Sequence, residues 1–190
     1  LDKYMREEMK FWIKDMHARL SITTLYVTHD QDEALTMSDR IAVLNRGKVE
    51  QVGTPVEIYE RPQTAFVTSF VGHSNIVEVD VLAAAADTAT VRLGDRTFLA
   101  PMRGIVAAGT KARLAVRPEN VIMDPRDSAA SLSARVLRET FQGPIIRYQL
   151  EVGGQTIVSE RQNQAGVRRY APGAQLTVGW DPACSHLLPC

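Results

Sequence analysis

The hydrophobic pattern of this chain of 190 residues changes its period near residues 72–75. Before that point, apolar residues recur at three- and four-residue steps, as they do in amphipathic helices. After it, apolar and polar residues alternate in short runs separated by turn residues, which is typical of a small β-barrel. We therefore expect two domains, an α/β domain over residues 1–73 and an all-β domain over residues 74–190.

The first domain begins with residues 3–20, which have the pattern of an amphipathic helix. Its apolar stripe, which we interpret as a core-packing face, contains Met5, Met9, Ile13, Met16 and Leu20. Residues 22–28 form a nearly continuous apolar and β-branched run. This run predicts a strand that is buried on both faces.

A capping pattern and a short connection predict the next elements. Asp30-x-x-Glu33 has the form of a capping box and predicts a short helix through Met37. Residues 40–45 and 48–53 predict two strands. Because the connection between them is so short, we expect these strands to be antiparallel.

Two short helices and a series of strands complete the expected elements. Thr54-Pro55 is a typical helix start, so we expect one helix that ends before Pro62 and another over residues 65–71. Alternation then predicts strands over residues 76–81, 89–93, 112–116, 133–137, 146–150 and 176–180.

Composition argues against several classes of protein. Lys and Arg together number 22, as do Asp and Glu, so no bulk charge favours nucleic acid or an anionic membrane. No apolar run approaches the length of a bilayer span. Cys184, His186 and Cys190 are too few and wrongly spaced for a zinc site, so we expect no metal site. The chain starts at Leu1 without an initiator methionine, and we expect it to be a fragment.

His29 is the main candidate for a functional residue. It comes directly after the expected buried strand and directly before a helix start. Open α/β sheets place their ligand chemistry at the carboxyl ends of strands. A neutral imidazole there can donate to a phosphate oxygen or position a water molecule. An isolated histidine at a strand end is otherwise most often structural.

Three segments around His29 carry a resemblance to a known family. They are Leu1-Asp2, residues 26–34 (YVTHDQDEA) and residues 39–62 (DRIAVLNRGKVEQVGTPVEIYERP). In this order they resemble the final third of an ABC-transporter ATPase domain. The closest branch powers bacterial import of sugars, polyamines, iron and other small solutes. The resemblance is nearly continuous from residue 1 to residue 72.

The resemblance implies roles for two residues. His29 matches the switch histidine, which contacts the ATP γ-phosphate and helps to hold the attacking water. Asp2 matches the end of the D-loop, at the interface between two ATPase subunits. We interpret Asp30 and Glu33 as helix caps and not as catalytic acids. The family also implies ATP and Mg²⁺ as cofactors of the full-length protein, and a homodimer bound to transmembrane permease subunits, with a solute-binding protein as an indirect partner. Its implied location is cytoplasmic, on the inner face of the bacterial membrane.

The parts that phosphoryl transfer needs are missing from the sequence. No G-x-x-x-x-G-K-[ST] motif is present, and residues 104–111 (GIVAAGTK) have Thr and Lys in the wrong order. Residues 152–155 (VGGQ) mimic the end of the family's LSGGQ signature, but they lie in a predicted hairpin turn. We therefore expect this chain alone to hydrolyse no ATP and to hold no tightly bound cofactor.

The second domain resembles the transport-associated OB-type (TOBE) domain of the same importers. The supporting segments are residues 115–121 (AVRPENV), residues 141–148 (FQGPIIRY) and residues 173–182 (GAQLTVGWDP). The resemblance implies an OB-like barrel that makes subunit contacts. The alternative is a regulatory module that binds a small ligand or a protein. Nucleic-acid binding is a weaker rival, because Arg161, Arg168 and Arg169 are best read as a solvated face.

The third interpretation is a free-standing hydrolase, and the sequence argues against it. His29 and Asp30 have no accompanying nucleophile or metal set. Within the importer reading, we favour spermidine/putrescine as the transported solute from the style of the barrel segment. We also expect self-association, because a fragment leaves apolar sheet and helix faces without neighbours.

Overall fold

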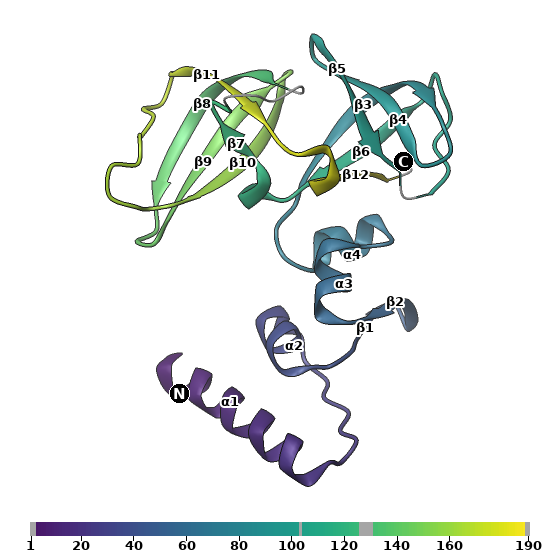
Figure 1. Cartoon of the computed structure of the whole chain (residues 1–190), viewed down its shortest axis with the longest axis vertical. Helices are drawn as coiled ribbons and strands as arrows, with labels where there is room; N and C mark the ends of the chain where they lie inside the picture. Colours follow the sequence, from purple (N-terminus) through teal and green to yellow (C-terminus); the bar gives the residue numbers. More distant parts are fainter. Residues whose placement is uncertain (1–2, 103, 126–130, 189–190) are drawn as a thin grey trace. The chain divides into compact units, whose positions relative to one another are not determined.

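The structure is a computed structural model that describes residues 3–102, 104–125 and 131–188. The chain divides into two compact units, Leu1–Gly72 and His73–Cys190, here called unit 1 and unit 2 (Figure 1). Each unit has a hydrophobic core of its own. Unit 1 contains the helices, whereas unit 2 is built from strands and two short 3-10 turns.

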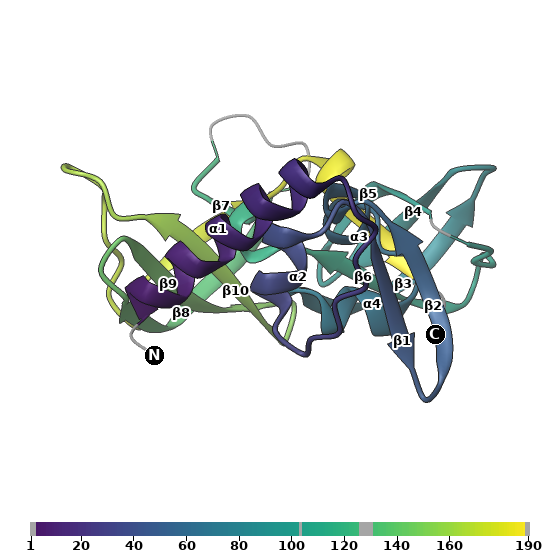
Figure 2. The ribbon, with the colours of Figure 1, turned by 90° about the horizontal axis from the view of Figure 1, so that it is seen from below.

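Unit 1 contains four helices and one hairpin among its described residues. In chain order they are α1 (Lys3–Leu20), α2 (Gln31–Met37), β1 (Ile41–Asn45), β2 (Lys48–Gly53), α3 (Pro55–Glu60) and α4 (Ala65–Phe70). Every helix predicted from the sequence is confirmed, and β1 and β2 pair antiparallel as expected (Figure 2). Arg46 and Gly47 both have positive φ in the two-residue turn, which suits the twist of a tight hairpin.

The core of unit 1 is small. Its buried apolar members are Val43, Ile58, Val67 and Val71. The buried side chain of Gln51 holds the segment that connects α3 to α4. Its amide donates to the carbonyl of Arg61 at 3.0 Å and accepts from the N–H of Gln63 at 2.8 Å. A side chain thus replaces the backbone partners that an irregular segment lacks.

The strand predicted over residues 22–28 is wrong. These residues are extended but pair with no strand in the described part of the chain. Leu25 is 91% exposed and Val27 is 87% exposed, so the segment is not buried on either face. A buried strand needs neighbouring strands to satisfy its backbone groups, and the described residues supply none. The hydrophobic run therefore has the composition of a core strand, but no described strand pairs with it.

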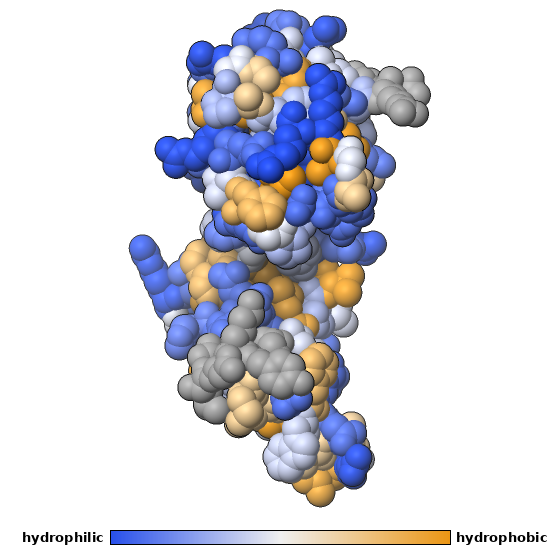
Figure 3. Space-filling model, turned by 90° about the vertical axis from the view of Figure 1, so that its left-hand side faces the viewer, coloured by the Kyte–Doolittle hydropathy of each residue, from blue (hydrophilic) through white to orange (hydrophobic). Residues whose placement is uncertain are grey.

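The apolar stripe of α1 is also not buried as expected. Met5, Met9 and Leu20 are all exposed. In Figure 3, apolar side chains reach the surface at the lower end of the view, where α1 lies. The helix itself is predicted correctly by its period, but no described element of unit 1 covers this stripe. The interpretation of the stripe as a packed core face is therefore wrong for these residues.

Unit 2 contains ten strands among its described residues. They are β3 (Asn75–Ala84), β4 (Thr88–Leu93), β5 (Arg96–Pro101), β6 (Lys111–Val116), β7 (Ile122–Met123), β8 (Leu132–Phe141), β9 (Ile145–Val152), β10 (Gln155–Gln162), β11 (Gln175–Gly179) and β12 (Ser185–Leu188). The six predicted strands are confirmed, although most are longer than their alternating runs.

The strands of unit 2 form two antiparallel sheets, so the expectation of one small barrel needs correction. Their orders are β12-β6-β3-β4-β5 and β10-β9-β8-β11-β7. The first sheet curls until Met102, just after β5, bridges to Leu187 on β12. In the second, the hydroxyl of Ser159 on β10 donates to the carbonyl of Val121 beside β7 at 2.7 Å. Each sheet is thus an OB-like half-barrel (Figure 1).

A single apolar core joins the two sheets of unit 2. Tyr148, Leu114 and Leu150 are completely buried in it. Phe98 from the first sheet and Trp180, just after β11, meet edge to face with ring centroids 5.8 Å apart. The chain builds β3 to β6, then the second sheet, and returns to the first sheet with β12. The first sheet is therefore discontinuous in sequence, whereas the second is formed by one continuous stretch of the chain.

The two sequence mimics of nucleotide motifs have structural roles in unit 2. Residues 104–110 are irregular, and Lys111 begins β6 and forms an ion pair with Glu78. Gly153 and Gly154 form the β9–β10 hairpin turn, as predicted, and both have positive φ. No described helix follows either segment directly, so neither has the geometry that wraps a phosphate.

Candidate functional site

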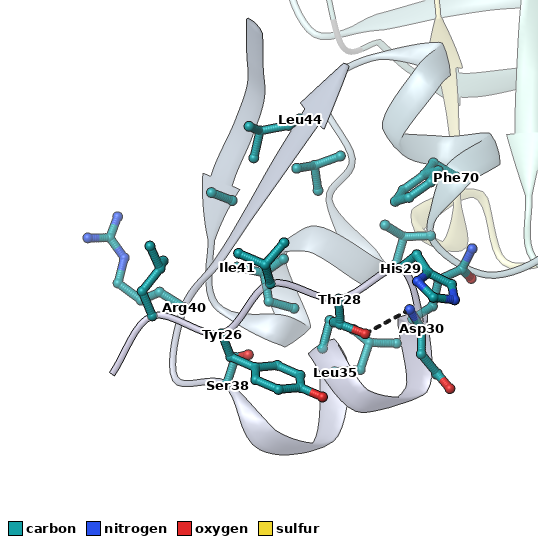
Figure 4. A pocket seen from close by; sticks show the side chains of 17 residues that line it. Tyr26, Thr28, His29, Asp30, Leu35, Ser38, Arg40, Ile41, Leu44 and Phe70 are labelled. Carbon is teal, nitrogen blue, oxygen red and sulfur yellow. Dashed lines mark hydrogen bonds between the residues drawn. The ribbon is translucent and has the colours of Figure 1, made fainter. Parts of the chain in front are cut away.

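The candidate site is an open cavity of about 290 Å³ in unit 1. One wall is the extended segment over residues 25–31, and another is β1 (Figure 4). Phe70 and Val71, at the end of α4, close a third side. The walls are mainly apolar, and His29, Asp30 and Gln31 supply polar groups at one end. An apolar cavity with a few polar groups at one end is a typical ligand or docking site.

His29 is exposed and lies on the same side of the cavity as Phe70 (Figure 4). Its imidazole has no hydrogen-bond partner among the described residues. The alternative that His29 is a structural histidine at a strand end therefore has no hydrogen bond of the ring to support it among the described residues. An exposed imidazole remains available to a ligand or to another chain.

The turn that carries His29 is shaped by Thr28, Asp30 and Glu33. The hydroxyl of Thr28 accepts from the N–H of Asp30 at 3.0 Å and donates to the carboxylate of Glu33 at 2.8 Å. The carboxylate of Asp30 accepts from the N–H groups of Asp32 and Glu33, at 2.9 and 3.2 Å. Asp30 is thus the predicted N-cap of α2. The capping box is only half formed, because Glu33 bonds to other side chains and not to the N–H of Asp30.

Glu33 also fixes the preceding residues through Tyr26, whose hydroxyl donates to its carboxylate at 2.9 Å. The hydrogen bond from Thr28, followed by the one from Tyr26, lowers the pKa of Glu33 below its ordinary value. The same contact with Glu33 raises the pKa of Tyr26. Both groups therefore keep their ordinary charge states at neutral pH, with Glu33 ionised and Tyr26 neutral.

Gln31 is a residue that the sequence analysis did not single out. Its side-chain oxygen accepts from the backbone N–H of Gly72 at 2.8 Å, across 41 residues of sequence. The bond brings the start of α2 to the residue that follows the α4 cap. A glutamine at the first position of a helix carries no sequence signal for such a long-range partner.

The predicted site residues are not brought together in the described structure. Asp2 lies outside the described residues, so His29 stands without the other predicted site residue. The described residues contain no group of three or more His, Cys, Asp or Glu side chains that could hold a metal ion. They also form no glycine-rich loop around His29. One exposed imidazole can contact a phosphate oxygen, but these residues do not form a complete nucleotide or Mg²⁺ site.

The three arginines of unit 2 are held by neighbouring groups. Arg168 lies over the ring of Tyr170, 4.9 Å from its centroid, and pairs with Asp124 at 3.3 Å. Arg169 forms an ion pair with Glu139. Arg161 donates to the carbonyl of Arg168 at 3.3 Å. Since carboxylates offset two of the three charges, this surface gives no support to a nucleic-acid site.

A family model and several curated proteins are similar to this chain. The family model described as "TOBE domain" matches residues 114–188, which run from β6 through β12. The chain is 38% identical over 186 residues to "Spermidine/putrescine import ATP-binding protein PotA 1" of Pseudomonas aeruginosa, covering 96% of this chain and 50% of the relative. It is 36% identical over 157 residues to "Fe(3+) ions import ATP-binding protein FbpC 1" of Rhizobium meliloti, covering 83% of this chain and 44% of the relative.

Other curated relatives show the same coverage. The spermidine/putrescine import ATP-binding protein of Rubrobacter xylanophilus is 38% identical over 186 residues, which are 95% of this chain and 49% of the relative. The chain therefore spans about half the length of the curated relatives it matches. Among solved structures, the cytoplasmic molybdate-binding protein ModG is similar with a TM-score of 0.48 and 21% identity, covering 60% of this chain and 96% of that chain. A similarity at this level gives no information about a ligand of this chain.

Proposed function

We propose that this chain, which carries a TOBE domain and is homologous along its length to the ATP-binding subunits of ABC importers, is the C-terminal half of such a subunit. The observation that carries the proposal is the match to an import ATP-binding protein over 96% of the chain, with both units included. In this proposal unit 1 is the end of the ATPase domain and unit 2 is the TOBE domain.

The uncovered segment at residues 22–28 supports this assignment of unit 1. Its apolar and β-branched residues suit a strand in the middle of a parallel sheet, yet residues 22–27 are all exposed. The N-terminal half of the subunit would supply the neighbouring strands and cover the apolar stripe of α1. His29 would then stand at the carboxyl end of a true sheet strand, where α/β proteins bind their ligands.

We assign His29 the contact with the ATP γ-phosphate and the positioning of the attacking water. Its support is its exposure at the rim of the cavity and the absence of an internal partner among the described residues. The phosphate cradle, the Mg²⁺ ligand and the catalytic carboxylate would come from the N-terminal half. Asp2 would lie at the interface of an ATPase homodimer. This chain alone is then inactive and holds neither ATP nor Mg²⁺ tightly.

The proposal assigns passage through the membrane to other subunits. No described helix combines the length and the apolar character that a membrane crossing requires. The ATP-binding subunit would bind transmembrane permeases on the cytoplasmic side of the bacterial membrane, and a solute-binding protein would be an indirect partner. Spermidine or putrescine is the solute we favour, since several relatives carry that name. An iron importer is the competing choice.

The role of His29 is tested by ATP hydrolysis in the full-length subunit with its permeases. His29→Ala should reduce hydrolysis at least about a hundredfold, because it removes a group that acts in the transition state. His73→Ala is a matched control, since His73 is also exposed but lies outside the cavity. Hydrolysis that is unchanged by His29→Ala would overturn the role. ATP-driven uptake of labelled spermidine by proteoliposomes tests the solute.

A further inference from the structure

The hydrogen bond between Gln31 and Gly72 connects two parts of unit 1 that are 41 residues apart in sequence. Gln31 is the first residue of α2 and follows His29 by two positions. Gly72 is the last residue of unit 1. The bond, at 2.8 Å, thus ties the segment that presents His29 to the point at which the chain leaves unit 1.

The bonds of the turn itself cannot hold His29 in place relative to the rest of unit 1. Thr28 and Asp30 bond only to groups within five residues of them, so they set the shape of the turn. At the other end of α2, Lys14 donates to the carbonyl of Thr36 at 2.9 Å. Gln31 fixes the end of α2 that lies next to His29, and its partner follows the cavity residue Val71 directly.

The conformation of Gly72 supports a specific contact. Its φ is +71°, a left-handed value that residues with a Cβ rarely adopt. Gly72 directs its N–H to Gln31 in this conformation, whereas Val71 just before it bonds to the carbonyl of Val67 in the α4 cap. Gln51 binds the backbone of another irregular segment in the same way. Side-chain amides thus organise the irregular segments of unit 1.

We infer that Gln31 is a positioning residue for His29 and acts through its bond to Gly72. This inference rests on the proposed role of His29 at the γ-phosphate. Without the bond, the start of α2 loses its hydrogen bond to the residue after Val71, and among the described residues only the apolar contacts of Leu35, one turn further along α2, still hold the helix to the core of unit 1. A misplacement of about 1 Å in a catalytic group can cost on the order of a hundredfold in rate. Because His73 follows Gly72 directly, the bond also connects the His29 segment to the chain that enters unit 2.

The first test uses this chain and measures the hydrogen exchange of the Gly72 amide by NMR. Gln31→Met keeps the length of the side chain but removes the oxygen, and Gln31→Glu keeps an oxygen acceptor. We expect exchange to be on the order of tenfold faster in Gln31→Met and close to the wild-type rate in Gln31→Glu. The amide of Val71 is an internal control, because its partner is the carbonyl of Val67. Unchanged exchange of Gly72 in Gln31→Met would overturn the inference.

The second test measures ATP hydrolysis by the full-length subunit. A positioning residue should change kcat more than KM, so Gln31→Met should lower kcat about tenfold or more and leave KM for ATP within about twofold. Gln31→Glu should recover most of this loss. Asp32→Ala is the control, since Asp32 is the exposed neighbour whose side chain makes none of the bonds described above. Equal losses in Gln31→Met and Gln31→Glu, or no loss in either, would overturn the inference.

The two tests separate the inference from the function on which it rests. If His29→Ala leaves ATP hydrolysis unchanged, the proposed role of His29 fails and the catalytic part of the inference fails with it. The exchange of the Gly72 amide still decides whether Gln31 anchors the segment. If instead His29→Ala abolishes hydrolysis and Gln31→Met does not affect it, only the positioning role of Gln31 is overturned.

Discussion

Asn75 and Gln155 join strand β3 to strand β10 by reciprocal use of their side-chain amides. Asn75 donates to the carbonyl of Val158 at 2.8 Å and accepts from its N–H at 2.6 Å. The side-chain amide of Gln155 likewise accepts a hydrogen bond from the backbone N–H of Glu78 and donates one to its carbonyl, both at 2.8 Å. Each amide therefore takes the place of a peptide group. The two sheets of unit 2 are connected at this point without a continuous strand ladder.

The two amides should differ in their contribution to stability, because Asn75 is 7% exposed and Gln155 is more accessible. Asn75→Leu leaves the N–H and carbonyl of Val158, at a part-buried position, without their side-chain partner. We expect the free energy of unfolding to fall by about 2–3 kcal/mol, against about 1 kcal/mol or less for Gln155→Leu. Urea unfolding followed by Trp180 fluorescence measures both, and equal effects would contradict this ranking.

The ion pair between Glu139 and Arg169 should make stability depend on pH in the acid range. The Arg169 guanidinium holds the pKa of Glu139 below its ordinary value; the Tyr148 hydroxyl helps, and burial opposes it. A lowered carboxyl pKa stabilises the fold above the unfolded-state pKa of about 4.3, and this contribution is lost as pH falls through the folded-state value. Glu139→Gln removes the charge but keeps an acceptor for Tyr148. Its unfolding free energy should fall below that of the wild type at pH 7 and converge with it in acid.

Glu151 offers the control for this pH effect. Glu151 pairs with Arg135, but both side chains are largely open to solvent, at 40% and 51% exposure. Exposed pairs contribute little, so Glu151→Gln should change the free energy of unfolding at pH 7 by about a few tenths of a kcal/mol at most. A profile for Glu139→Gln that is parallel to the wild type at every pH would count against the assignment.

Local sequence signals predicted the helices and the hairpin of unit 1. The errors concern burial, because the elements that would cover the apolar residues are not among the described residues. The caps at Asp30 and Thr54 and the short hairpin connection act within a few residues, and the structure has all of them. The segment over residues 22–28 has the right composition for a buried strand, but burial depends on neighbours that its own sequence cannot specify. The same holds for the exposed stripe of α1.

In unit 2, strands with a clear alternation were predicted and the others were missed. β10 contains Ser159, Glu160 and Arg161 in succession, so three polar residues break its pattern. Of these, Glu160 forms an ion pair with Arg147 on β9. β12 has only four residues, all buried, and follows a short 3-10 turn. At the candidate site, the position of His29 in the sequence made it a candidate, whereas nothing in the sequence singled out Gln31, because its partner Gly72 is distant in sequence.

The two glycines of the β9–β10 turn should differ in how much stability is lost when each is replaced by alanine. Gly153 and Gly154 both have positive φ, at +56° and +78°. A Cβ on Gly154 meets no atom within 4 Å, whereas a Cβ on Gly153 would lie 3.1 Å from the N and 3.2 Å from the Cα of Gly94. Gly154→Ala should cost about 1–2 kcal/mol from backbone strain alone. Gly153→Ala should cost about 1–3 kcal/mol more, because the turn at Gly94 must move. Equal unfolding midpoints in urea for Gly153→Ala and Gly154→Ala would show that the turn at Gly94 moves without a cost in stability.

Thr54 should contribute to unit 1 chiefly through its hydroxyl. The hydroxyl accepts from the N–H of Glu57 at 3.3 Å, and the Glu57 carboxylate accepts from the N–H of Thr54 at 2.8 Å, which completes a capping box. Thr54→Ala removes one half of the box and should lower the stability of unit 1 by about 1 kcal/mol, whereas Thr54→Ser should restore most of it. Hydrogen exchange of the Glu57 amide reports the loss directly. A loss of protection in Thr54→Ser as large as in Thr54→Ala would mean that the methyl group, and not the cap, stabilises the start of α3.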